Sequence, residues 1–467
     1  DDQQGEDGRN RAVSAVSAAA VLTLLVVSAV LVTRVLRERD LARDNFALLK
    51  SILENVDPDK STGVVQLLDG AAQRLDEVPP ESDIAQAEVR EIIGKVYRIF
   101  GEYDKARANQ VMALAIRERR ASGDDPAVAE TLHYLAATLW WEGKYTEAEG
   151  LYERSLAMRR RLHASAHEDV AMSLTHLAAC RLRTGKPEGA RDLYQQALDM
   201  RRVLARGTET VHVAQALNNL AKCSLDVGRY GEAEGLFRQA LDMIRRLKGD
   251  SFSGTAAASQ NLGDCLLRRA EASLLAGDRD GAIGIAGSAH EAFDRALQIR
   301  STMFPNGHHL VAGTLVALAR AELLAGDLAR ADELAHQSVE MFRKTRRLDH
   351  PEIGEALQVL GTVQLASASA EAVATLEQAL AITKLAHPPS PIGLARLHVQ
   401  LARALTHAGR FPDAQPPLVQ AVASLRQLLG DHSSETRDAA ALLATVYARN
   451  GDDAAAESIR AVATPSK

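Results

Sequence analysis

A glycine that returns about every 42 residues constrains the fold of this chain more than any other feature. The recurring glycines are Gly101, Gly143, Gly185, Gly228, Gly277, Gly326, Gly409 and Gly451, with Ala368 near the place expected between Gly326 and Gly409. Each lies between two stretches with the apolar spacing of helices, as in residues 219–243, NLAKCSLDVGRYGEAEGLFRQALDM. A fixed period of this length with a helix–turn–helix pattern indicates a helical solenoid, in which each helix pair packs only on its neighbours. The sequence therefore predicts an all-α array that binds peptides or proteins.

Composition and motifs exclude several other functions. The net charge of −6 is mixed along the chain and only 4% of the residues are aromatic, so no basic stripe with interleaved aromatic residues exists. Nucleic acid is therefore not an expected partner. The sequence lacks the Gly-rich, His-Arg-Asp and Asp-Phe-Gly motifs of a protein kinase, and it lacks H-E-x-x-H, G-x-S-x-G and Walker motifs. We expect no enzymatic activity and no cofactor in this chain.

Cysteines and histidines follow the repeat rather than the short spacings of metal ligands. The spacings of Cys180, Cys223 and Cys265 are 43 and 42 residues, so these residues occupy one position of three successive first helices. Zinc sites use tight spacings such as C-x2-C, which are absent. Histidines at the junctions between repeats also recur at the period of the array: His167, His350, His387 and His432. The sequence predicts buried cysteines and no metal site.

The N-terminal region differs from the repeats. Residues 12–33, AVSAVSAAAVLTLLVVSAVLVT, carry no charge between Arg11 and Arg34. As a helix they would span about 33 Å, which is enough to cross the hydrocarbon core of a bilayer. A signal peptide is the alternative, but its apolar region is normally shorter and follows an initiator Met. We expect residues 1–11 to be a truncated polar tail, 12–33 a transmembrane helix, 34–83 a charged helical neck and 84–467 the repeats.

The frame of each repeat is similar to the tetratricopeptide repeat. One repeat has Leu220, Ala221, Gly228, Tyr230 and Ala233, and another has Leu135, Ala136, Gly143, Tyr145 and Ala148 at the same spacings. The small residue before the turn lets the two helices approach, and the aromatic residue fills the space beside the turn. The resemblance implies a right-handed solenoid of about nine repeats. The steps before and after Gly277 are 49 residues each, so the repeat at 252–305 is expected to be an elongated hairpin.

The order of the segments carries a second resemblance. The stretch ALNNLA at 216–221 and the stretch YTEAEGLYERSLAMRRRL at 145–162 resemble kinesin light chain repeats. The apolar segment, the neck RERDLARDNFALLKSILENVDPD at 37–59 and the array together resemble the C-terminal region of bacterial, membrane-anchored, eukaryotic-like Ser/Thr protein kinases. This resemblance implies a protein- or peptide-binding scaffold or sensor region of a receptor-like kinase whose catalytic domain is not in this chain. A stand-alone membrane-tethered scaffold for envelope or secretion assembly is the alternative.

The charge pattern and the kinase resemblance make opposite predictions about the side of the membrane on which the repeats lie. Basic residues follow the apolar segment at Arg34, Arg37 and Arg39, and the positive-inside rule would place the repeats in the cytoplasm. The kinase resemblance instead implies a single-pass protein of a bacterial cell membrane with extracytoplasmic repeats. Self-association into a homo-oligomer is left open.

The tetratricopeptide resemblance also implies where a ligand binds. First helices line the concave groove, and the residues ten, nine and six before the turn glycine point inward; His133, Asp264 and Arg320 are among them. The polar candidates in this frame are Tyr134, His176, Asn218, Asn219, Lys222 and Asn261. Side-chain amides can bond both N–H and C=O groups of an extended peptide. Trp140 and Trp141 lie at the groove end of a first helix, and one of them is expected to anchor a ligand. The alternative is a solvated helix face that binds nothing.

Overall fold

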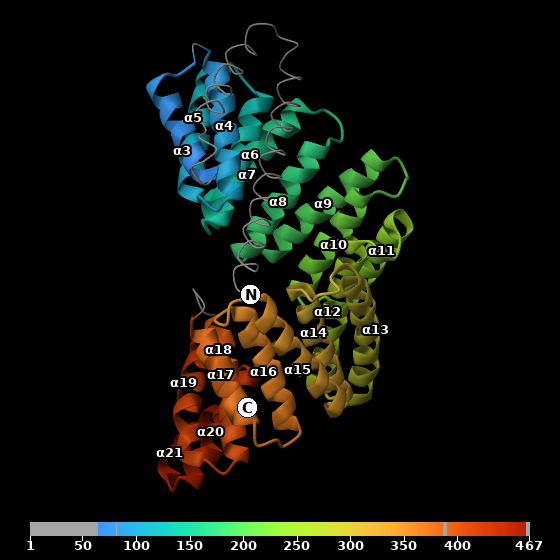
Figure 1. The fold of residues 1–467 in the computed structure, drawn as a ribbon, viewed down its shortest axis with the longest axis vertical. Coiled ribbons are helices and arrows are strands. Elements are labelled where there is room, and N and C mark those ends of the chain that lie inside the picture. Colours follow the sequence, from blue (N-terminus) through green and yellow to red (C-terminus); the bar gives the residue numbers. More distant parts are fainter. Residues whose placement is uncertain (1–63, 81, 386–389, 464–467) are drawn as a thin grey trace, which may run out of the picture. The chain divides into compact units, whose positions relative to one another are not determined.

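The computed structural model describes residues 64–80, 82–385 and 390–463 (Figure 1). The described residues form two compact units, divided between Thr208 and Glu209. The predicted polar tail, the predicted transmembrane segment and the first part of the predicted neck lie outside the described residues. Among the residues that are described, no helix combines the length and apolar character needed to cross a membrane.

The first unit consists of helices joined by short turns. They are α3 (Val64–Glu77), α4 (Asp83–Ile99), α5 (Tyr103–Arg120), α6 (Pro126–Trp141), α7 (Tyr145–Leu162), α8 (Glu168–Arg183) and α9 (Pro187–Ala205). After α3, consecutive helices form antiparallel pairs, and each pair packs on the next. The helix α3 is held against the first pair because Asp69 accepts hydrogen bonds from Tyr97 Oη and Lys105 Nζ, each over 2.7 Å.

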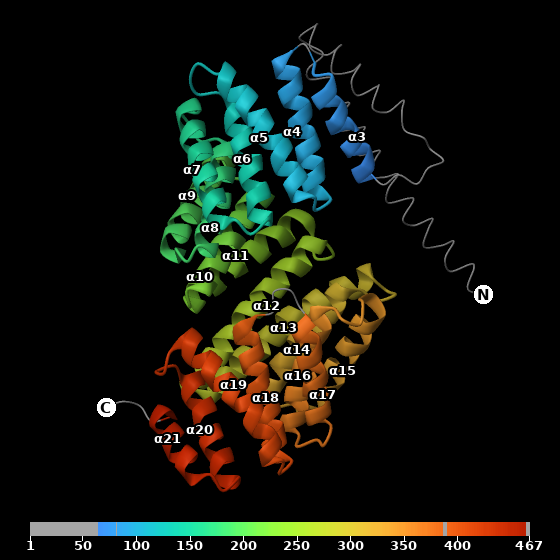
Figure 2. The same ribbon diagram turned by 90° about the vertical axis from the view of Figure 1, so that its left-hand side faces the viewer.

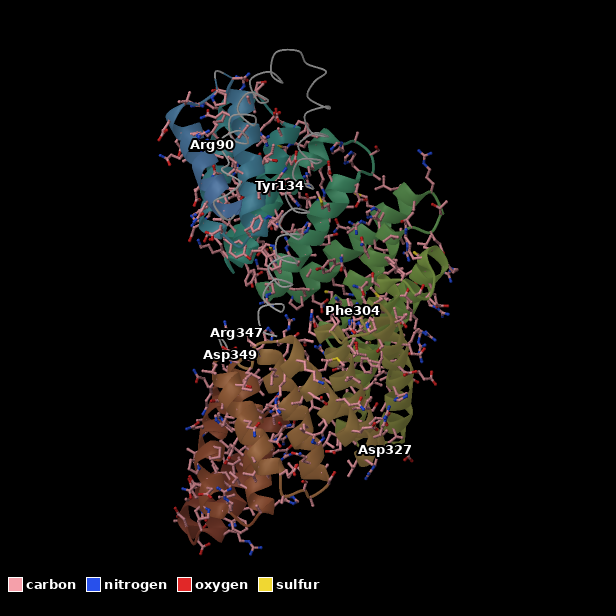
Figure 3. All side chains as sticks on the ribbon, in the orientation of Figure 1. Arg90, Tyr134, Phe304, Asp327, Arg347 and Asp349 are labelled. Carbon is pink, nitrogen blue, oxygen red and sulfur yellow. The ribbon has the colours of Figure 1, made fainter. Side chains whose placement is uncertain are left out.

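The second unit repeats this arrangement six times. Its helices are α10 (Val211–Asp226), α11 (Tyr230–Lys248), α12 (Ser253–Leu275), α13 (Arg279–Met303), α14 (His309–Ala325), α15 (Leu328–Thr345), α16 (Pro351–Ala366), α17 (Ala372–Leu385), α18 (Pro391–His407), α19 (Phe411–Leu429), α20 (Ser434–Arg449) and α21 (Asp453–Ala463). Figure 2 shows its last helices packed as neighbouring pairs. Phe304 and Asp327 lie beyond opposite ends of α14 (Figure 3), so junctions between pairs and turns within pairs lie on opposite edges of this unit.

Helix starts follow from the chemistry of the junctions. Asp125 precedes Pro126, the first residue of α6, and its carboxylate accepts hydrogen bonds from the backbone N–H groups of Ala127 and Val128 over 2.7 and 3.2 Å. Proline suits the first helical position because its missing N–H has no partner there in any case. Thr210 caps α10 in the same way. These caps fix where α6 and α10 begin.

The turns within the pairs require a left-handed backbone. The eight recurring glycines all have φ between 72° and 90°. At the corresponding turn between α16 and α17, Ala368 adopts φ 54°, although only glycine enters this region without a steric cost from Cβ. The array therefore imposes the same turn on a residue that is unsuited to it.

Replacing Ala368 with glycine should raise the free energy of unfolding by about 1 kcal/mol, because the strain at a left-handed alanine is relieved. Urea denaturation of the full chain measures the change. The same exchange at exposed Ala441, inside α20, should lower stability by about 1 kcal/mol, because glycine is unfavourable in a helix interior. Changes of equal sign at the two positions would contradict the role of Ala368.

A buried arginine joins successive pairs at several junctions. Arg159 of α7 donates to the backbone oxygen of Asp169 and to Ser173 Oγ of α8, over 3.0 and 2.8 Å. Arg117 makes the equivalent bonds to Ala127 O and Thr131 Oγ1, and Arg300 makes them to Leu310 O and Thr314 Oγ1. Other junctions place an apolar residue and an alanine at the same two positions: Ile244 with Ala258, Phe342 with Ala356, and Leu425 with Ala439. The buried Arg201 is an exception, because Gln215 stands at the position of the hydroxyl residue and the arginine pairs with Glu168 instead.

First helices form the inner side of each unit. Beyond the contacts between consecutive helices, α4, α6 and α8 contact one another in sequence, and so do α12, α14, α16, α18 and α20. No two second helices in the described residues approach each other as closely. A stack whose first helices are closest curves around them, so a groove on either unit is lined by first helices.

The pair α12 and α13 is longer than the others. These helices have 23 and 25 residues, whereas α10 and α11 have 16 and 19. At the tip, Leu275 is 82% exposed, and Leu274 and Ile283 are also exposed. The lower part of the hairpin is fixed to its neighbours through Arg269 with Glu234 and Glu271 with Arg320.

Candidate functional site

Tyr134 and His176, two predicted groove residues, lie in the first unit and are largely engaged by their own chain. The ammonium group of Lys95 lies 3.8 Å from the centre of the Tyr134 ring, which Figure 3 shows on this unit. A cation over an aromatic face is attracted by the negative charge of that face. His176 stacks on Tyr152 with 5.6 Å between ring centres, and its Nδ1 lies 3.0 Å from Met172 O.

His133 is a correction to the predicted groove. The repeat frame directs it inward, but its side chain is only 3% exposed, because the rings of Tyr152 and His176 pack against it with centres 5.1 and 4.8 Å away. Burial, together with His176 and nearby cations such as Arg159, lowers the pKa of His133 to about 2. This histidine is a neutral core residue and is not available to a ligand.

The two tryptophans have different environments. Trp140 packs edge-on against Trp141 and Tyr145, with ring centres 5.0 and 5.9 Å away, and its Nε1 is buried without a hydrogen-bond partner in the described residues. Trp141 is 55% exposed. Trp141 is therefore the more exposed ring of the pair, and Trp140 is partly covered.

The predicted groove residues of the second unit surround a polar cavity. Asn261 of α12 donates from Nδ2 to Asn218 Oδ1 of α10 over 2.7 Å, so it pairs with Asn218 and not with Asn219. A cavity of about 350 Å³ opens beside this amide pair. Its lining comprises Lys222, Leu225, Asp226, Phe237, Asn261, Asp264, Leu267, Arg268 and Arg320. Lys222 and Asn261 line it; Asn218 and Asn219 are half-buried on α10 nearby.

The cavity has an apolar floor and charged walls. Leu225, Phe237 and Leu267 are buried, whereas Lys222 is exposed and forms no ion pair within the described part of the chain. Arg268 lies 3.5 Å from Asp226, and Arg320 pairs with Glu271 over 2.5 Å. Burial raises the pKa of Asp264, although Gln260 donates a hydrogen bond to its carboxylate over 3.2 Å. The site can therefore accommodate an apolar side chain and bond a polar backbone at its rim.

Sequence reasoning missed part of this site. Asp264 and Arg320 occupy inward positions of the frame but were not among the selected candidates. Arg268 lies four residues after Asp264 and one repeat after Asp226, which also lines the cavity. Four residues are about one helical turn, which places both side chains on one face. That spacing is the signal that could have identified Arg268.

Matches to two models of repeat families identify the family of this chain. A tetratricopeptide repeat model matches residues 127–202, 212–274 and 310–384, and a second tetratricopeptide repeat model matches 399–435. Together the matches cover more than half of the chain. The chain belongs to the tetratricopeptide repeat family. The recurring glycines and inward first helices are thus features of a tetratricopeptide repeat solenoid, and the predicted all-helical repeat fold is confirmed.

Solved structures share this repeat fold. The apo form of the quorum sensor NprR from B. thuringiensis has a TM-score of 0.54 at 13% identity, covering 83% of this chain and 99% of that one. The apo form of RapI has a TM-score of 0.52 at 12% identity, covering 81% and 96%. Repeats of a putative kinesin light chain from Podosopora anserina have a TM-score of 0.38 at 22% identity, covering 46% and 96%. Among curated proteins, none matches the chain.

Proposed function

We propose that this tetratricopeptide repeat protein binds an extended peptide segment of a partner protein on the inner face of its second unit, at the cavity beside Asn261. The observation that carries the proposal is the convergence of amide, charged and apolar side chains from α10, α11, α12 and α14 on one opening. Repeat solenoids use such concave surfaces for binding.

The chemistry of the cavity fits a peptide. The bond between Asn261 and Asn218 uses one donor and one acceptor, so each amide keeps further capacity for a peptide N–H or C=O. The buried floor of Leu225, Phe237 and Leu267 would receive one apolar side chain of the ligand. The first unit supports this role less, because Tyr134 and His176 are covered by their own neighbours.

Replacing both Asn218 and Asn261 with alanine should weaken binding at least about tenfold, because each lost hydrogen bond costs on the order of 1 kcal/mol. The ligand is a peptide selected from a random library against the full chain, and fluorescence anisotropy measures its affinity. Gln239→Ala, an exposed amide on the second helix α11, is the matched control and should leave affinity unchanged. Unchanged binding by the double variant, with helical content intact, would refute the proposed site.

We further propose that residues 12–33 tether the repeats to a membrane and that the whole protein is a receptor-like kinase with extracytoplasmic repeats. The uncharged stretch of 22 residues and the order of segments support this. A reporter that is active only after export, fused after Lys467 in the full-length parent protein, should be active. Activity of a cytoplasm-only reporter would instead favour the positive-inside argument.

A further inference from the structure

Three metal-binding side chains meet at the junction between α7 and α8. His163 follows the last residue of α7, His167 caps the start of α8, and Asp169 lies in its first turn. One potential ligand atom from each residue lies within 4.8 Å of the other two. The imidazole rings stack with centres 3.6 Å apart, and His167 Nδ1 lies 3.6 Å from Asp169 Oδ2. All three side chains are partly exposed.

We propose that His163, His167 and Asp169 bind one divalent transition-metal ion, with Zn²⁺ the best match, and thereby clip α7 to α8. Two imidazoles and one carboxylate form a ligand set that zinc accepts, and solvent can supply a fourth ligand. The ligand atoms must approach one another by about 1 Å to reach tetrahedral contact distances, which side-chain rotation can provide.

The junction between α13 and α14 has the same histidine cap and ring stacking without the other two potential metal ligands. His308 caps α14 through its Nδ1, which accepts a hydrogen bond from Leu310 N over 3.2 Å, as His167 accepts one from Asp169 N. The ring that stacks on His308 belongs to Phe304, with centres 4.0 Å apart. The cap and the stack therefore require neither a histidine at the position of His163 nor an acid at that of Asp169.

Metal binding would compete with the cap. The hydrogen bond from Asp169 N occupies Nδ1 of His167. A metal on that nitrogen replaces the cap, whereas a metal on Nε2 requires the Nδ1 tautomer to carry the proton and also breaks it. Binding thus exchanges one bond within α8 for a link between two helices.

The junction of α13 and α14 supplies the matched variants. His163→Phe reproduces the natural Phe304–His308 stack and removes one ligand nitrogen, and Asp169→Asn removes the charged ligand. Zn²⁺ is titrated by calorimetry into the metal-free full chain at pH 7.5. The wild type should bind one more equivalent than either variant, or bind it at least tenfold more tightly, while the metal-free melting temperatures stay equal.

A gain of function completes the test. Phe304→His with Leu310→Asp rebuilds the cluster at the second junction, where Leu310 is exposed, and should add one Zn²⁺ equivalent. Equal zinc binding by the wild type, His163→Phe and Asp169→Asn would overturn the site. If the metal-free variants melt lower than the wild type, the three side chains are structural and the proposal is also overturned.

Discussion

Replacing Arg159 with leucine should lower the free energy of unfolding of the first unit by about 2 kcal/mol, because one buried and one partly buried acceptor lose a charged donor. Arg159 is 4% exposed and bonds Asp169 O and Ser173 Oγ across the junction of α7 and α8. Leucine fills part of the space but donates no hydrogen bond. Urea denaturation, followed by circular dichroism, measures the loss.

The partner residue makes this prediction specific. Ser173→Ala alone should cost about 1 kcal/mol, but in the Arg159→Leu background it should be neutral or stabilising, because it removes a hydroxyl without a donor. The pair Ile244 and Ala258 already shows the apolar combination in the second unit. Arg160→Leu is the control, since this arginine is exposed and should change stability by less than about 0.5 kcal/mol. Additive effects of the two changes would contradict the coupling.

Acidification from pH 7 to pH 5 should destabilise the first unit by about 2 kcal/mol through His133 alone. The folded pKa of this histidine is lowered to about 2, mainly by burial, whereas the unfolded chain has the ordinary value near 6.5. Below pH 6.5 the unfolded state therefore binds a proton that the folded state does not. The stabilising contribution is complete above pH 6.5 and is lost as the pH falls.

His133→Leu should remove this share of the pH dependence while leaving a part that belongs to His176, whose pKa is also lowered by burial. Stability curves in urea at half-unit steps between pH 5 and pH 7.5 would separate the two contributions. Carboxylates titrate mostly below this window and contribute little to it. Parallel pH profiles for the wild type and the variant would show that His133 is solvated and protonated in the folded state.

The turns and helix pairs could be predicted from the sequence because each repeat encodes them locally. The glycine spacing locates the turn within each helix pair, including the turn at Ala368, whose residue type gives no signal for a left-handed backbone. The repeat frame also gave the direction of each inward side chain. It does not predict whether other side chains bury that residue. His133, for example, is buried by Tyr152 and His176 on the two following helices.

Two groups of side chains could not be predicted from the repeat period. Arg268 lines the cavity one helical turn after Asp264, outside the three positions of a first helix that the repeat frame directs inward. The junction histidines recur one repeat apart, whereas His167 contacts His163, four residues away across a loop that is not helical. The path of such a loop depends on how the two flanking helices pack, which neither spacing nor composition specifies.

The restriction of contacts to neighbouring pairs has a kinetic consequence. Hydrogen bonds between pairs join residues close in sequence, such as Arg320 with Glu271, 49 positions apart, and Asn261 with Asn218, 43 apart. Loop closure therefore costs little entropy, and proteins with such local contacts fold quickly. Folding can nucleate at any well-packed pair and spread along the chain in both directions. Folding of the Arg159→Leu variant should then slow at the junction of α7 and α8. Partly folded molecules would accumulate, and a short pulse of protease should cut them near residues 163–167.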